Sequence, residues 1–218
     1  MLTMNRLDLE YFEKVEADEN LDKILKYSRE NHIPTMLTNT GKLLYKYVKD
    51  VKPKSILEIG TAIGYSGIVM ITASENKSHL TTIEKNEERV LLAKNNFKMC
   101  NLDKNVEILQ GDASEIINEI KSQKYDFIFL DGSKSQYIKQ IDMLLDMLNN
   151  GGKIFIDDAL YMYDVYKEGD VPHKHRAMIK NLRNFVIKIL DNKTISKKIF
   201  NYDEGIIVVS KRDIEIYK

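Results

Sequence analysis

Short apolar runs alternate with longer amphipathic stretches through the middle of the chain. Five runs are rich in aliphatic, aromatic or β-branched residues, at 55–59, 79–84, 106–110, 125–130 and 153–157. Runs that are apolar on both faces are typical of strands in a covered parallel sheet. The stretches between them have helical spacing, at 65–74, 87–100, 113–120 and 136–148. This alternation predicts an α/β sandwich with right-handed crossovers.

Both ends of the chain depart from this alternation. Residues 1–50 carry apolar stripes at helical spacing, which predict an N-terminal helical extension for contacts with substrate or a second subunit. After a helix near 175–190, the runs at 194–200 and 205–210 are close enough to form an antiparallel hairpin at one edge of the sheet. We therefore expect one main domain over residues 51–218.

Composition places the chain among ordinary globular proteins, since 43% of its 218 residues are hydrophobic and 30% are charged. The single cysteine, Cys100, excludes a disulfide framework and a cysteine zinc site. No apolar run approaches the ~18–20 residues that span a bilayer, so no membrane partner is expected. The acidic N-terminus does not resemble a secretory signal. These features favour a reducing, cytoplasmic setting.

The formal net charge of zero conceals an uneven distribution. Residues 1–22 hold seven acidic and two basic side chains, whereas residues 171–218 hold eleven basic and five acidic ones. Phosphate contacts need lysine and arginine, so the C-terminal quarter is a candidate nucleic-acid surface. Its candidate contact residues are Lys174, His175, Arg176 and Lys180, which share a predicted helix. A solvated helix face explains the same residues equally well.

The first predicted strand leads into a turn with two glycines. Gly60 and Gly64 have Gly-x-x-x-Gly spacing, and Glu58 stands two residues before the first of them. The spacing matches neither a dinucleotide fingerprint nor a phosphate loop. Glycines let the backbone turn sharply and approach a ligand, and an acid here would repel phosphate. The turn therefore suits a cationic ligand, whose pocket Tyr65 and Ser66 could line.

Two more acids follow the next two predicted strands. Glu84 ends the run 79–84, where nucleotide-binding folds have an acid that accepts hydrogen bonds from ribose hydroxyls, and Asp112 follows the run 106–110. The carboxyl ends of parallel strands meet at one edge of a sheet, where ligands bind. A nucleoside with a positive centre and no phosphates, S-adenosylmethionine (SAM), fits this set of acids. The alternative is that each acid caps the helix that follows it.

A second group of acids follows the fourth and fifth predicted strands. Asp131 comes directly after residues 125–130, and Asp157 and Asp158 follow residues 153–156. Converging carboxylates repel one another, and a hard divalent cation such as Mg²⁺ would relieve that repulsion and orient a substrate oxygen. Lys134 could take the substrate's hydroxyl proton as a general base. The alternatives are an ion-paired or solvated Lys134 and an Asp158 that caps a turn.

These residues together resemble the class I, metal-dependent O-methyltransferases, the catechol O-methyltransferase-like family. The segments that carry the resemblance are 33–36, 57–66, 83–86, 111–113, 129–134 and 156–158, in that order. The resemblance implies a Rossmann-like, seven-stranded sheet whose last strand is antiparallel. It also implies SAM as methyl donor and a homodimer.

The same resemblance implies roles for individual residues. Asp131, Asp157 and Asp158 would hold the divalent metal, although the family generally has Asp-Asn where this chain has Asp157-Asp158. Asp131 and Lys134 would be catalytic, with Lys134 as the base. The implied cofactor-binding residues are Met36, Glu58, Gly60, Thr61, Gly64, Tyr65, Ser66, Glu84, Gly111, Asp112, Ala113 and Asp131.

Within this family the chain is most similar to the bacterial branch that methylates 5-hydroxyuridine at the wobble position of tRNA. Residues 52–66, 134–137 and 173–176 carry that closer similarity. It implies the tRNA anticodon stem-loop as substrate and 5-methoxyuridine as product. The 5-hydroxyl and 4-carbonyl of that base are vicinal oxygens that can chelate one magnesium ion, as a catechol does. The alternatives are a small-molecule, catechol-type O-methyltransferase and a non-catalytic binding protein on the same fold.

Overall fold

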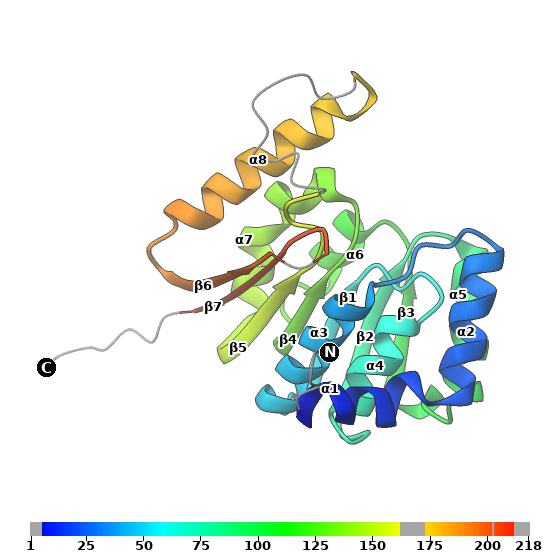
Figure 1. Ribbon diagram of the computed structural model, residues 1–218. Helices are drawn as coiled ribbons and strands as arrows, with labels where there is room; N and C mark the ends of the chain where they lie inside the picture. Colours follow the sequence, from blue (N-terminus) through cyan, green and yellow to red (C-terminus); the bar gives the residue numbers. More distant parts are fainter. Residues whose placement is uncertain (1–5, 162–172, 202, 212–218) are drawn as a thin grey trace, which may run out of the picture.

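A central sheet with helices on both faces makes up most of the molecule (Figure 1). The computed structural model describes residues 6–161, 173–201 and 203–211, without the side chains of residues 6–8 and Lys174. The strands are β1 (Ser55–Ile59), β2 (His79–Glu84), β3 (Val106–Gln110), β4 (Tyr125–Leu130), β5 (Leu148–Ile156), β6 (Ile195–Phe200) and β7 (Ile206–Lys211). The α-helices are α1 (Arg6–Tyr11), α2 (Glu19–Glu30), α3 (Thr38–Val51), α4 (Tyr65–Ala73), α5 (Glu87–Met99), α6 (Ala113–Glu119), α7 (Tyr137–Met147) and α8 (Arg176–Asp191).

The seven strands of the described residues lie in the order β3-β2-β1-β4-β5-β7-β6. Strands β1 to β5 run parallel to one another, and β7 runs antiparallel to both β5 and β6. This arrangement confirms the predicted Rossmann-like α/β sandwich with an antiparallel strand at its C-terminal end. The helices expected between the strands are also present, with ends that shift by one residue.

The start of β5 is the strand boundary that differs most from the prediction, whereas the other boundaries differ by at most one residue. Strand β5 begins at Leu148, five residues before the expected start at Lys153. Leu148 pairs with Tyr125 of β4, and the register then shifts before Lys153 pairs with Phe127. The residues in between include Gly151, which has a φ of +78°. Glycines usually end a strand in a sequence-based prediction, whereas here the extra residues form an irregularity within it.

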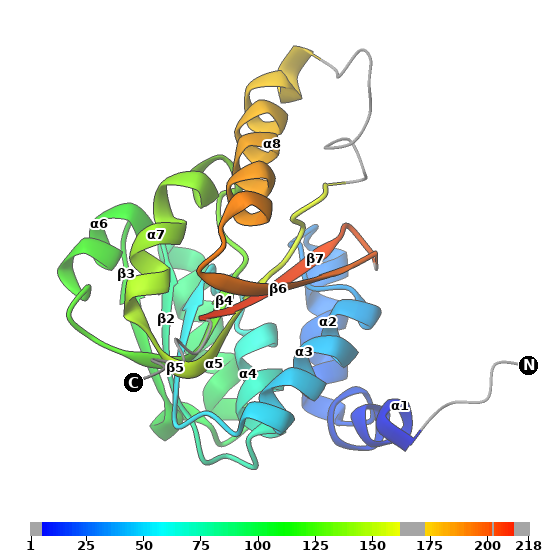
Figure 2. The same cartoon turned by 90° about the vertical axis from the view of Figure 1, so that its left-hand side faces the viewer.

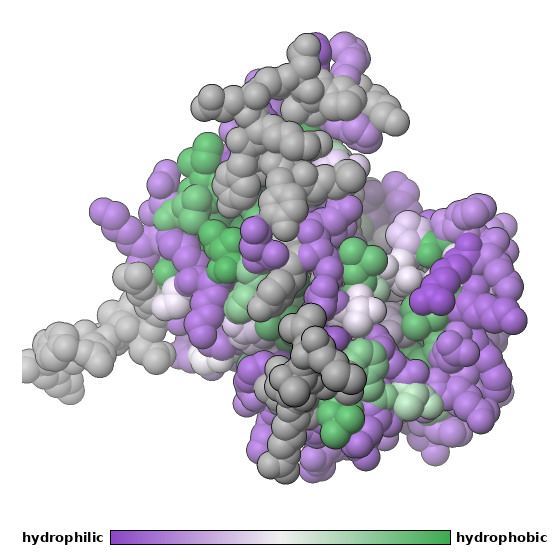
Figure 3. Space-filling view, viewed as in Figure 1, coloured by the Kyte–Doolittle hydropathy of each residue, from purple (hydrophilic) through white to green (hydrophobic). Residues whose placement is uncertain are grey.

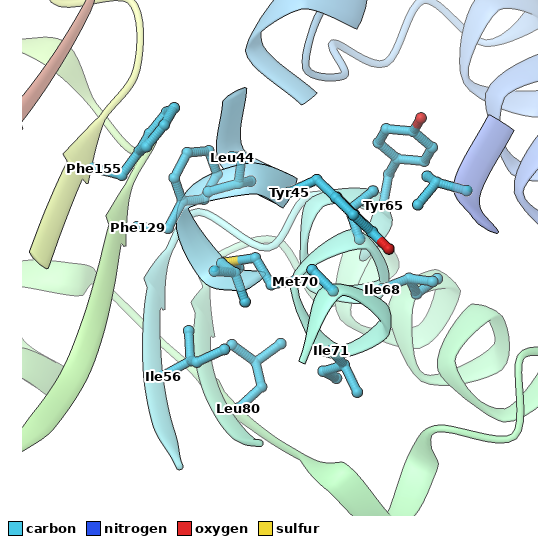
Figure 4. Packing of buried hydrophobic residues seen from close by; sticks show 14 of the residues in the cluster. Leu44, Tyr45, Ile56, Tyr65, Ile68, Met70, Ile71, Leu80, Phe129 and Phe155 are labelled. Atoms are coloured by element: carbon cyan, nitrogen blue, oxygen red, sulfur yellow. The ribbon is translucent and has the colours of Figure 1, made fainter. Parts of the chain in front are cut away.

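Alternation along each strand divides the core into two hydrophobic clusters. In β1, Ile56 faces the cluster under α3 and α4, whereas Leu57 and Ile59 face the cluster under α7 and α8. Figure 4 shows the first cluster, where side chains of α3, α4, β1, β2, β4 and β5 meet. Figure 2 shows α3 and α4 on one side of the sheet and α6 and α7 on the other. A buried aliphatic side chain typically stabilises the fold by ~1.5–3 kcal/mol, so these clusters fix the sheet that carries the site.

The N-terminal helices share the first of these clusters. Leu44 and Val48 of α3 are fully buried in it. The amino end of α3 is held by Asp203, which lies just before β7 and accepts hydrogen bonds from the backbone N–H of Thr40 at 2.8 Å and from its hydroxyl at 2.9 Å. Residues 38–51 therefore belong to the same packed unit as the sheet. Contacts of residues 1–50 with substrate or a second subunit stay a prediction.

Among the described residues, no helix is both long and apolar enough to cross a membrane.

Candidate functional site

A cavity of about 670 Å³ opens at the carboxyl ends of the parallel strands. Its wall comes from the residues that follow strands β1 to β5, from residues 34–37 and Thr40, and from Glu204. The predicted site residues that line it are Met36, Gly60, Glu84, Gly111, Asp112, Ala113, Asp131, Lys134, Asp157 and Asp158. The structure thus brings the predicted acids of both groups, apart from Glu58, to one cavity.

Glu84 ties the turns after β1 and β2 together. Its carboxylate accepts one hydrogen bond from the backbone N–H of Ala62 at 2.9 Å and another from that of Asn86 at 2.8 Å. Gly60 lies in the same turn with a φ of +102°, and a Cβ there would stand 2.4 Å from the carbonyl oxygen of Asp131. Only glycine allows this close approach. The turn is therefore fixed against the residue that follows β4.

Glu58 does not face the cavity, because its side chain points toward the face of the sheet that α4 covers. It is fully buried, and its two oxygens accept hydrogen bonds from Ser66 at 2.5 Å and Thr82 at 2.6 Å. Burial raises the pKa of Glu58 to about 7. The expectation that its charge faces a cationic ligand is therefore not supported by its position.

Four other predicted cofactor-binding residues also lie outside the cavity lining. Thr61 is buried, with its hydroxyl 2.6 Å from that of Thr82. Gly64, with a φ of +87°, is the N-cap residue of α4, and Tyr65 packs in the first hydrophobic cluster. These residues and Ser66 therefore lie on the side of the turn after β1 that faces α4 and the hydrophobic core. Direct contact between them and a cofactor stays a prediction.

Asp112 both caps a helix and lines the cavity. Its carboxylate accepts from the backbone N–H of Ser114 at 3.0 Å at the start of α6 and pairs with Lys85 at 3.0 Å. Lys85, and then the Ser114 N–H, lowers the pKa of Asp112. The alternative of a helix cap is thus confirmed for this residue.

The acids after β4 and β5 lie next to one another at the sheet edge. The N–H of Asp131 donates to the carbonyl of Ile59 at 3.0 Å, and the N–H of Asp157 donates to that of Leu130 at 3.1 Å, so both residues continue the sheet ladder. Burial and then the charges of Asp157 and Asp158 raise the pKa of Asp131 well above its usual range. Burial and Asp158 raise the pKa of Asp157 to about 7. The site therefore concentrates negative charge.

Lys134 balances part of this charge. Its ammonium lies 2.6 Å from Asp158, and both side chains are largely buried. Burial alone would lower the pKa of Lys134, but the charges of Asp158 and then Asp131 and Asp157 raise it above its ordinary value. The structure thus shows an ion-paired lysine, one of the two alternatives for this residue.

The carboxylates of Asp131, Asp157 and Asp158 are the candidate ligands for a metal ion. Within the described residues, no group of three His, Cys, Asp or Glu side chains is arranged to hold a metal ion. Asp158 pairs with Lys134, and Asp157 accepts from the backbone N–H of Asp158 at 2.8 Å. The donor chemistry nevertheless fits, because carboxylate oxygens are the ligands that Mg²⁺ prefers and their mutual repulsion favours a cation.

A buried tyrosine, Tyr137, holds the two strand ends beneath these acids. Its hydroxyl lies 3.3 Å from the carbonyl oxygens of Leu130 and Asp157 and can donate to either. Burial, followed by the nearby carboxylates, raises its pKa well above the usual range. Tyr137 is therefore a fixed support between β4 and β5.

Glu204 was not predicted as a site residue. It follows Asp203 in the turn before β7, and its backbone carbonyl accepts from the N–H of Leu160 at 3.1 Å. Asp203 holds the same turn to α3, so the turn is fixed on two sides. In the sequence Glu204 is only an acid next to a glycine, which gives no signal for a site. The antiparallel pairing of β7 with β5 brings Glu204 to the cavity.

The predicted nucleic-acid residues lie where α8 begins, beyond the carboxyl ends of the strands (Figure 1). Arg176 and Lys180 are exposed, and Figure 3 shows hydrophilic side chains at this end of the helix. The ring centroid of His175 lies 6.0 Å from that of Tyr161, which in turn lies 5.9 Å from the Lys134 ammonium. The side chain of Lys174 lies outside the described residues. The structure thus joins the start of α8 to the acidic end of the cavity.

Comparison with known proteins identifies the family. The model of the O-methyltransferase family matches residues 13–212, and the chain belongs to that family. Caffeoyl-CoA O-methyltransferase from Medicago sativa is 28% identical over 163 residues, which cover 72% of this chain and 65% of the relative. Caffeoyl-CoA O-methyltransferase 1 from Arabidopsis thaliana is 27% identical, with 72% and 62% covered. The chain thus spans less than two thirds of these relatives' own length.

Solved O-methyltransferase structures share the fold of this chain. A candidate caffeoyl-CoA O-methyltransferase from Staphylococcus aureus has a TM-score of 0.84 and 26% identity, with 94% of this chain and 97% of that chain covered. An O-methyltransferase from Bacillus cereus, solved in complex with SAH, has a TM-score of 0.79 and 23% identity, with 96% and 99% covered. At that second identity the likeness concerns the fold alone.

Proposed function

We propose that this protein is a SAM-dependent O-methyltransferase that works with a divalent cation. The observation that carries the proposal is one cavity with two different ends. Glu84 and the glycine turn form one end, and Asp131, Asp157, Asp158 and Lys134 form the other. A methyl donor at the first end and an oxygen nucleophile at the second would meet over β1 and β4. Membership of the O-methyltransferase family supports this assignment.

The chain's own residues would act mainly by positioning. Glu84 would accept hydrogen bonds from the ribose hydroxyls of the donor, and the turn after β1, which lies against Asp131, would hold the donor there. Holding two reactants in attack geometry can lower a barrier by ~7–11 kcal/mol. Lys134 lies where it can take a proton from the acceptor hydroxyl, once the surrounding carboxylate charge is neutralised.

The metal would be held by Asp131, Asp157 and Asp158. A bound Mg²⁺ or another divalent cation would polarise the acceptor's oxygens and lower the pKa of its hydroxyl. The ion pair between Lys134 and Asp158 would have to open to free the Asp158 carboxylate.

For the acceptor, we infer 5-hydroxyuridine at the wobble position of tRNA, with 5-methoxyuridine as product. The exposed cations at the start of α8 support this acceptor. They follow His175, whose ring contacts Tyr161, and Tyr161 in turn lies near the Lys134 ammonium at the acidic end of the cavity. A homodimer, implied by the resemblance, is a further part of the proposal, and light scattering tests it.

A small-molecule acceptor with vicinal oxygens is the second candidate. The caffeoyl-CoA O-methyltransferases among the relatives favour it. The acceptor chemistry is the same in both cases, so the difference lies in what surrounds the two oxygens.

Nucleoside mass spectrometry separates the two acceptors. Bulk tRNA that carries 5-hydroxyuridine and, in parallel, a free catechol are incubated with protein, SAM and Mg²⁺. We expect 5-methoxyuridine in the tRNA, and an Arg176→Ala, Lys180→Ala variant should bind tRNA more weakly with a smaller salt dependence. Faster turnover of the catechol than of tRNA would favour the small-molecule enzyme. No methyl transfer to either would contradict the proposed function.

A further inference from the structure

One side-chain atom in the cavity wall lacks a hydrogen-bond partner. Of the side-chain nitrogen and oxygen atoms buried in the described part of the chain, only the amide oxygen Oε1 of Gln140 has none. Gln140 lines the cavity and is 5% exposed. Buried polar groups are nearly always hydrogen-bonded. A lone acceptor at a cavity wall therefore indicates a ligand that brings an N–H or O–H donor.

The position of Gln140 restricts where that donor would lie. Gln140 stands in α7 between Tyr137 and Ile141, which pack in the second hydrophobic cluster. Long side chains on a helix lean toward its amino end, which places the amide toward Gln136, also in the cavity wall. Ala113 at the start of α6 packs on the same cluster and lines the same cavity. Figure 2 shows α6 and α7 on the same side of the sheet.

This side of the cavity suits the base of the proposed donor. Glu84, at the end of β2, is the expected partner of the ribose. The segment with Met36 and Thr40 lies on the opposite face with α3. With the ribose at Glu84, the base would lie against the part of the cavity wall that Ala113, Gln136 and Gln140 form.

Each oxygen of the other acid in this part of the wall, Asp112, already has one partner, the Ser114 N–H and the Lys85 ammonium. Both oxygens of Glu84 are likewise engaged. Gln140 differs from both acids, because its buried amide oxygen has no partner in the described part of the chain. A glutamine amide matches an adenine edge well, because its oxygen accepts from the exocyclic amino group while its nitrogen donates to a ring nitrogen.

We propose that Gln140 recognises the adenine base of the methyl donor, with Oε1 as the acceptor for the exocyclic amino group. The proposal rests on SAM being the donor. It makes Gln140 a specificity-determining residue for the base, in a role separate from those of Asp112 and Glu84.

The test compares two ligands that differ at one group. S-adenosylhomocysteine carries the 6-amino donor, and S-inosylhomocysteine carries a 6-oxo acceptor in its place. Isothermal titration calorimetry without metal or acceptor measures the Kd of both. The wild-type protein should prefer S-adenosylhomocysteine by ~5–150-fold, the discrimination of one good bidentate pair. The Gln140→Met variant should bind the two ligands with nearly equal Kd.

Three further variants make the result specific. Gln136→Met changes an amide in the same wall and should keep the wild-type preference. Gln140→Glu retains an acceptor oxygen and should also keep the preference, whereas Gln140→Leu lacks an acceptor and should lose it, which tests the inference even where the methionine variant folds poorly. An unchanged preference in a folded Gln140→Met protein overturns the inference about the base while the donor assignment stands. Failure of the wild-type protein to bind S-adenosylhomocysteine overturns the proposed function itself.

Discussion

The two ends of the cavity hold their carboxylates in opposite ways. At the β2 end, both oxygens of Glu84 accept hydrogen bonds from backbone N–H groups, so its charge is fixed in place. At the β4 and β5 end, burial and then the neighbouring acids raise the pKa of both carboxyl groups, with Asp157 and Asp158 acting on Asp131 and Asp158 acting on Asp157, and Lys134 balances only part of the charge. The first end is complete before any ligand arrives, whereas the second favours the arrival of a cation.

The largest effect should come from the acidic end. Replacing Asp157 with Ala removes one of three carboxylates for the cation, and we expect methyl transfer to be abolished. S-adenosylhomocysteine should still bind with unchanged Kd in calorimetry, because Glu84 is untouched. The control is Asp142→Asn, an exposed acid of α7 that pairs with Lys188. A large loss of S-adenosylhomocysteine binding in Asp157→Ala would show that the two ends are not separate.

Lys134→Met should have the next largest effect. A general base typically contributes ~10²–10⁴-fold to a rate, so kcat should fall by that factor while the Kd of S-adenosylhomocysteine stays unchanged. Lys139→Met, which alters an exposed lysine of the same region, is the matched control. A near wild-type kcat in Lys134→Met would leave the residue as an ion-pair partner of Asp158 only.

Glu84→Gln tests the preformed end. The amide would place an NH₂ group against a backbone N–H donor, and the loss of a hydrogen bond to a charged group costs ~1.5–3 kcal/mol, equivalent to ~10–150-fold in Kd. Calorimetry with S-adenosylhomocysteine measures the change, and the exposed Glu88→Gln in α5 is the control. Equal Kd values for Glu84→Gln and wild type would remove Glu84 from donor binding.

The smallest effect concerns the pH dependence of stability. Burial raises the pKa of Glu58 from its ordinary 4.5 to about 7 in the folded protein. The folded state therefore holds the proton more tightly, and this contribution to stability is full below pH ~4.5 and is lost as the pH rises toward 7. Urea unfolding from pH 4.5 to 8 should show a shallower decline for Glu58→Gln than for wild type. If the free energy of unfolding of the two proteins changed with pH in the same way, the raised pKa of the buried Glu58 carboxyl group would be contradicted.

The fold was predictable because its signals are local and repeated. Apolar runs and helical stretches alternate from β1 to β5, and the antiparallel pairing of β7 follows from the short connection after β6. The start of β5 was missed, because Gly151 and Gly152 lie inside the strand rather than before it.

The strongest predictions for the site were acids at the carboxyl end of a strand. Glu84 is the last residue of β2, Asp131 and Asp157 directly follow β4 and β5, and all three reach the cavity. Glu58 lies inside β1, one residue before its end, and the alternation of side chains along the strand turns it toward Ser66 and away from the cavity. Gln140 escaped attention, because a glutamine within an amphipathic helix has no sequence signal that separates a cavity wall from solvent.

Calorimetric titration of S-adenosylhomocysteine with and without a chelator, alongside a methyl-transfer assay, tests the contrast between the two ends most directly. We expect the same Kd in the presence of EDTA and of Mg²⁺, with methyl transfer abolished by EDTA and restored by added Mg²⁺. Methyl transfer that persists in EDTA, or S-adenosylhomocysteine binding that requires Mg²⁺, would contradict this division between a preformed donor end and a cation-dependent acidic end.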